Sequence, residues 1–176
     1  MIMRPGQQLL LPANPVFIWS SLLAALLFNF LLNMGGAGRA AWVPDLLAII
    51  LVFWTVHQPL RVSIGAAFMF GLCMDVHQTS WLGQHALAYT VLSFLAITIH
   101  RRLLWFPVPS QALQVFPLLA LAHVIELALR LLGKAGFPGW PVVLAPVIEA
   151  ALWPVISVLL LLPQRRAPDP DENRPL

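Results

Sequence analysis

Long apolar stretches separated by short polar connections constrain the fold of this chain more than any other feature of its sequence. Of its 176 residues, 60% are hydrophobic and 10% are charged. Soluble domains have about a quarter of their residues charged, because their surfaces face water. This chain has too little polar surface to cover a soluble globule, so we predict an all-α integral membrane protein. Its net charge of +3 indicates a basic cytoplasmic face rather than binding to nucleic acid.

Six apolar stretches approach the roughly 20 residues that a helix needs to cross a bilayer core of about 30 Å. Asn14 and Pro15 suit the N-cap and first helical position of the first stretch. The second stretch is short and is closed by Pro59, so a full or a partial crossing are both open. The predicted transmembrane helices, which we expect to form one bundle, are Pro15–Asn33, Pro44–His57, Arg61–Val76, Trp81–His100, Gln111–Leu132 and Pro141–Leu162.

These helices make one predicted transmembrane domain, residues 15–163. Residues 1–14 are expected to be a cytoplasmic N-terminal segment, and the polar, proline-rich residues 164–176 a disordered cytoplasmic tail. Basic residues indicate the orientation, because cytoplasmic loops have an excess of Lys and Arg. Seven fall on the side of the two termini, against Arg39 and Lys134 on the other side. We therefore expect both termini in the cytoplasm.

Polar residues gather at the predicted outer ends of the second, third and fourth spans. Asp45, Asp75, Gln84 and His85 fall in one layer if the spans alternate in direction. Asp45 lies near a helix N-terminus, where the dipole stabilises a carboxylate by ~0.3–1 kcal/mol. Asp75 lies near a helix C-terminus, so it needs a compensating donor, for which His85, His77 and Gln84 are candidates. Either these groups are solvated at the interface, or they form a layer that packs helices, binds a partner or lines a pocket.

A second polar group lies within the fifth and sixth spans. His123, Glu126 and Arg130 share one face of the fifth span. Glu126 lies about 9 Å, and Glu149 of the sixth span about 12 Å, from the outer ends of their helices. The two carboxylates are expected to face each other, or Glu126 to pair with Arg130. An ion pair that fixes helix packing and a path for protons or substrate are the two interpretations.

The sequence predicts no catalytic residue, no cofactor and no metal. The histidines and carboxylates do not follow a tight ligand spacing such as HExxH. The serines lack a nucleophile motif such as G-x-S-x-G. The single cysteine, Cys73, lies in an apolar run and is interpreted as packing. Gly65 and Gly71 are interpreted as positions where two helices approach closely.

Several motifs, in order and at fitting spacing, resemble the MreD family of bacterial rod shape-determining membrane proteins. The resemblance covers about residues 15–163. The matching segments are Pro44-Asp45-Leu46-Leu47, Val52-Phe53-Trp54 with His57 and Pro59, Gly71-Leu72 with Asp75, Leu82-Gly83-Gln84-His85-Ala86-Leu87-Ala88-Tyr89, His100-Arg101-Arg102, Phe137-Pro138-Gly139-Trp140 and Leu152-Trp153-Pro154.

The resemblance implies a non-enzymatic scaffold of the cell-elongation (rod) complex in the bacterial inner membrane, which helps to organise peptidoglycan synthesis. MreC is the main expected partner, with MreB, RodA, a class B penicillin-binding protein and membrane lipid as further ones. The family is also similar in fold to the substrate-binding S-components of ECF vitamin transporters. That similarity keeps open an alternative function, a membrane subunit that binds a small ligand or lipid.

Overall fold

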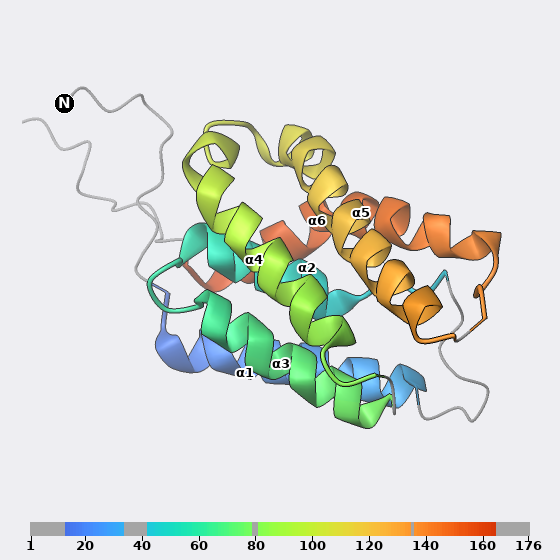
Figure 1. Ribbon diagram of the computed structural model, residues 1–176. Helices are drawn as coiled ribbons and strands as arrows, with labels where there is room; N and C mark the ends of the chain where they lie inside the picture. The colour runs from blue at the N-terminus through green and yellow to red at the C-terminus, as the bar shows by residue number, and fades with distance from the viewer. Residues whose placement is uncertain (1–12, 34–41, 79–80, 135, 165–176) are drawn as a thin grey trace, which may run out of the picture.

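The computed structural model describes residues 13–33, 42–78, 81–134 and 136–164, and these form one bundle of α-helices (Figure 1). Two short 3₁₀ turns, Trp140–Val143 and Leu162–Gln164, flank the last helix. The helices are α1 (Pro15–Asn33), α2 (Leu46–His57), α3 (Ile64–His77), α4 (Gln84–Leu103), α5 (Val108–Leu132) and α6 (Leu144–Leu161). The predicted all-α membrane bundle is confirmed. The segments predicted at 1–14 and 164–176 lie almost wholly outside the described residues.

The predicted helix starts differ from the observed ones after the first helix. α2 begins at Leu46 rather than Pro44, because Asp45 adopts an extended conformation and caps the helix. The fourth helix begins three residues later than predicted, at Gln84, and the fifth three residues earlier, at Val108. The sixth α-helix begins at Leu144, after the 3₁₀ turn. Helix ends depend on caps and turns, which apolar periodicity does not reveal.

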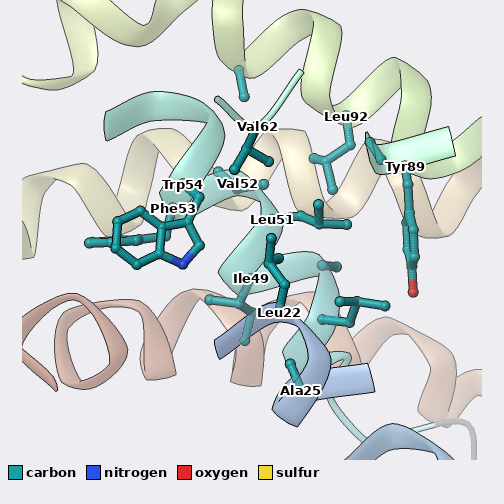
Figure 2. Packing of buried hydrophobic residues seen from close by; sticks show 14 of the residues in the cluster. Leu22, Ala25, Ile49, Leu51, Val52, Phe53, Trp54, Val62, Tyr89 and Leu92 are labelled. Carbon is teal, nitrogen blue, oxygen red and sulfur yellow. The ribbon is translucent and has the colours of Figure 1, made fainter. Parts of the chain in front are cut away.

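Helix α2 lies in the middle of the bundle and contacts α1, α4 and α6. Nine of its 12 residues are buried, because it is apolar on every side and neighbours cover every side. Figure 2 shows Ile49, Leu51, Val52, Phe53 and Trp54 of α2 packed among side chains of the surrounding helices. The centre of the bundle is therefore filled by large apolar side chains.

Aromatic rings that carry a polar atom are bonded within this core. The indole N–H of Trp54 donates to Ser21 Oγ of α1 over 2.8 Å. The indole N–H of Trp153 in α6 donates to Gln111 Oε1 of α5 over 3.3 Å. Helices in lipid associate through close packing and interhelical hydrogen bonds rather than through the hydrophobic effect. These two bonds therefore help to hold α1 against α2 and α5 against α6.

Three helical segments are long and apolar enough to cross a membrane among the described residues, namely Pro15–Asn33, Val108–Leu132 and Trp140–Gln164. The apolar helices α2 and α3 are shorter, with 12 and 14 residues. At 1.5 Å per residue α2 is about 18 Å long, well under a bilayer core of about 30 Å. Helix α2 is therefore shorter than the bilayer core, and α1, α4 and α6 contact it inside the bundle.

A close approach of two helices depends on the missing side chain at Gly71 but not at Gly65. A methyl group on Gly71 would lie 2.6 Å from the Ala86 nitrogen and 2.8 Å from the His85 carbonyl carbon. The interpretation of Gly71 as a close-packing position is therefore confirmed, and it brings α3 against the start of α4. The same interpretation was wrong for Gly65, where a methyl group would meet only Ser63 Oγ at 3.8 Å.

Candidate functional site: a polar layer

Asp75 in the last turn of α3 caps the start of α4. Its carboxylate accepts the main-chain N–H of Gly83 and of His85, both over 2.8 Å, and that of Ala86 over 3.3 Å. The His85 ring donates from Nδ1 to the same carboxylate over 2.8 Å. The first N–H groups of a helix have no partner in their own helix, and the dipole there favours an anion. Asp75 thus lies at the unfavourable end of α3 but at the favourable end of α4.

Gly83 allows the turn that brings these main-chain N–H groups to the Asp75 carboxylate. It is the N-cap of α4 and has φ +103°, in the left-handed region that a side chain disfavours. Its N–H turns back to Asp75 while Gln84 starts the helix. Of the three donors expected for Asp75, His85 is the one that its carboxylate binds.

Asp45 joins three helices at the start of α2. Its Oδ1 accepts the N–H of Ala48 over 3.1 Å, which caps α2, and the side-chain amide of Asn29 in α1 over 2.7 Å. Its Oδ2 accepts the hydroxyl hydrogen of Tyr89 in α4 through a short hydrogen bond. Asp45 is 2% and Asp75 0% exposed, so both are buried structural groups. The interpretation of solvated interface residues is wrong for these two.

Glu149 of α6 links α2 to α5. Its Oε1 accepts the main-chain N–H of Asp45 over 2.7 Å and the Nε2–H of His123 over 2.8 Å. The other ring nitrogen of His123, Nδ1, lies 3.7 Å from Glu126 Oε2. His123 therefore stands between the two carboxylates that were expected to face each other.

Three other predicted residues lie outside these contacts. Gln84 is half-buried at the first position of α4, and its main-chain N–H donates to Trp81 over 3.0 Å. His77 stacks on Phe30 of α1 and donates from Nε2 to its carbonyl oxygen over 3.3 Å. Arg130 is exposed, and the ion pair that the described residues give Glu126 is with His123. The expected pairing of Glu126 with Arg130 was therefore wrong.

These contacts form one layer that draws on all six helices. It lies where α1, α3 and α5 end and α2, α4 and α6 begin, which we call the polar end of the bundle (Figure 1). The His85 and Tyr89 rings, with centroids 6.0 Å apart, connect the Asp75 contacts to the Asp45 contacts. The polar layer consists of Asn29, Asp45, Asp75, His85, Tyr89, His123, Glu126 and Glu149.

Two members of the polar layer were missed from the sequence, Asn29 and Tyr89. Asn29 is a buried polar residue in a largely apolar stretch, and Tyr89 is the only tyrosine in the chain. A polar group inside a membrane helix usually marks an interhelical contact. That signal was present for both residues, although it could not name Asp45 as their common partner.

The geometry of the polar layer is that of a clamp between helix ends. Its carboxylates accept from helix N-termini, an amide, a phenol and two imidazoles. Within the described ranges, no group of three or more His, Cys, Asp or Glu side chains could hold a metal ion. What the arrangement does chemically is fix the starts of α2 and α4 against the ends of their neighbours.

Comparisons with known proteins agree in pointing to one family. Residues 13–162 match the family described as rod shape-determining protein MreD. The chain is 27% identical over 148 residues to the rod shape-determining protein MreD of Haemophilus influenzae, which is 81% of this chain and 89% of that protein. No solved structure is significantly similar to the chain.

Proposed function

Because the chain belongs to the MreD family of rod shape-determining membrane proteins, we propose that it is a non-enzymatic, multi-pass scaffold of the inner membrane. In this role it binds MreC and helps to organise peptidoglycan synthesis during cell elongation. MreB, RodA and a class B penicillin-binding protein are further partners in the proposal. The observation that supports it best is the polar layer, which joins six helices without the arrangement of an active site.

The proposed orientation puts both termini in the cytoplasm and the polar end of the bundle toward the periplasm. Seven Lys and Arg residues then lie on the cytoplasmic side, and three lie on the periplasmic side, namely Arg39, Lys134 and Arg130 in the last turn of α5. An excess of basic residues in cytoplasmic loops is the general rule for membrane proteins. In this orientation the helix ends fixed by the polar layer face the compartment in which the cell wall is built.

A scaffold needs a surface of constant shape, and the polar layer would provide one. Asp75 holds α4 against α3, and Glu149 holds α2 and α5 against α6. Breaking a buried, hydrogen-bonded charge pair costs about 3–5 kcal/mol, so these contacts resist separation of the helices. The polar end would therefore present its helix ends to a partner in one arrangement.

The alternative, a subunit that binds a small ligand or lipid like an ECF S-component, has weaker support. Such a subunit needs an internal site between its helices. Below the polar layer, the middle of this bundle is filled by side chains such as Phe53, Trp54 and Trp153. We therefore favour the scaffold.

Complementation with copurification tests the proposal. In a rod-shaped host depleted of its own MreD, the wild-type chain should restore rod shape and copurify with MreC. Asp75→Ala and His85→Ala should reduce the MreC yield and give rounded cells at normal expression, whereas Gln84→Ala, the matched neighbour outside the polar layer, should not. Wild-type shape and yield in both Asp75→Ala and His85→Ala would contradict the proposal.

A further inference from the structure

Glu126 differs from the other three carboxylates of the polar layer in its hydrogen bonds. Asp45, Asp75 and Glu149 each accept from two or more N–H or O–H donors. Among the described residues, Glu126 has an ion pair with His123 at 3.7 Å, which is too long for a hydrogen bond, and no hydrogen bond of its own. A carboxylate at membrane depth with unfilled acceptors is costly and indicates a function.

The position of Glu126 shows from which side a donor can reach it. Buried residues of α5 recur at Val115, Leu119 and Ala122, and Glu126 follows four residues later on the same, inward face. It lies six residues before Leu132, or about 9 Å from the end of α5. Its side chain is 16% exposed. A donor must therefore enter from the polar end rather than from the lipid.

Beside it, Glu149 also has an unfilled acceptor. Its Oε1 is bonded to Asp45 and His123, but its Oε2 is buried and has no hydrogen-bond partner within the described part of the chain. His123 thus stands between two carboxylates with spare acceptor capacity. Large side chains fill the core below this point, and the Glu126 side chain is 16% exposed whereas that of Glu149 is 0% exposed, so Glu126 is the carboxylate that a donor from outside can reach.

We propose that Glu126 is the docking point for a lysine or arginine side chain from the partner's segment just outside the membrane. A cationic donor would complement the carboxylate charge and fill its open acceptors at once. The inference rests on the proposed function, since it names the contact by which the scaffold holds its partner. A small ammonium ligand and a second copy of this chain are the other occupants that the experiment distinguishes.

Direct binding of purified full-length MreC in one detergent tests the contact. Glu126→Gln should raise Kd about tenfold, because one member of a paired charge is lost. Glu126→Lys should raise Kd further, and changing one juxtamembrane Lys or Arg of MreC to Glu should partly restore binding to it. Affinity of the wild type should fall with added KCl, and affinity of Glu126→Gln should fall less. Arg130→Gln, an exposed charge one turn away, is the matched control and should bind as the wild type does.

Each outcome separates the contact from the wider proposal. Equal Kd values for Glu126→Gln and the wild type would overturn the contact but leave MreC binding standing. If Glu126→Gln loses self-association but binds MreC as the wild type does, the occupant is a second copy of this chain and the contact is overturned. If Glu126→Gln loses only the binding of tetramethylammonium and binds MreC as the wild type does, the occupant is a small ammonium ligand and the contact is overturned too. A wild-type chain that does not bind MreC would overturn the proposed function, and the contact with it. The unfolding temperature of Glu126→Gln should stay close to that of the wild type, since only the 3.7 Å ion pair with His123 and no hydrogen bond is lost, and a large drop would assign Glu126 to the fold instead.

Discussion

The main-chain N–H of Asp45 donates to Glu149 Oε1 over 2.7 Å, although 104 positions separate the two residues. This bond joins the start of the central helix α2 to α6, the last helix of the bundle. Glu149 also accepts from His123 of α5, so one carboxylate connects three helices. Its loss should therefore affect the whole bundle rather than one helix end.

Glu149→Ala should lower the free energy of unfolding by about 3–5 kcal/mol, because it leaves the buried Asp45 N–H and the His123 ring without their acceptor. Glu149→Gln keeps an acceptor oxygen and should cost less. Unfolding in detergent, titrated with SDS and followed by tryptophan fluorescence, gives both values. Glu126→Gln provides the comparison, since that carboxylate accepts no hydrogen bond within the described residues. A Glu149→Ala protein as stable as the wild type would show that the Glu149 contacts contribute nothing to the fold.

Tyr89→Phe should cost about 1.5–3 kcal/mol, the usual value of a hydrogen bond to a charged group. The substitution removes only the hydroxyl that donates to Asp45 and keeps the buried ring. Ser20→Ala is a suitable control, because that exposed hydroxyl donates only to a carbonyl of its own helix. The same SDS titration measures both, and an equal effect of the two changes would argue against a special role for Tyr89.

Gly71→Ala should destabilise the protein by about 1–3 kcal/mol, because the added methyl group would overlap the backbone of α4. Gly65→Ala, in the same helix, has open space and should be neutral or stabilise by about 0.4–1 kcal/mol. The difference in unfolding temperature between these two variants measures the close approach of α3 to α4. If both variants have the same unfolding temperature, α3 and α4 do not approach as closely as described.

Gly83→Ala should weaken the capping of α4 by Asp75 at a cost of about 1 kcal/mol or more, because φ +103° strains any residue with a side chain. Gly136→Ala is the control, since it has ordinary φ and nothing within 4 Å of an added methyl group. Hydrogen exchange at His85 and Ala86 should become faster in Gly83→Ala and stay unchanged in Gly136→Ala. Unchanged protection in both would show that Asp75 does not depend on this glycine.

The helices could be predicted from the sequence because each apolar run has to be buried in lipid or in protein. The first helix was predicted with its observed bounds, and all six runs became helices. Charge bias and counting along the helices brought Asp45, Asp75 and His85 to one level. Those arguments depend only on length and composition, which the sequence states directly.

The partners within the polar layer could not be predicted in the same way. Counting put Glu126 and Glu149 at similar depth, but which side chain stands between them depends on how α5 and α6 rotate and tilt. His123 takes that place, whereas the side chain of Arg130, four residues after Glu126, is exposed. Likewise, the convergence of Asn29 and Tyr89 on Asp45 follows from the packing of α1 and α4 around α2. Such contacts are properties of the assembled bundle.

The bond between Asp45 and Glu149 also orders events during biosynthesis. A ribosome makes Asp45 104 residues before Glu149, so α2 enters the membrane before its acceptor on α6 exists. At about 18 Å, α2 is also too short to be held by lipid alone. Completion of the last helix therefore supplies an acceptor at the start of the central one, and a chain that ends before α6 would leave the Asp45 N–H without it.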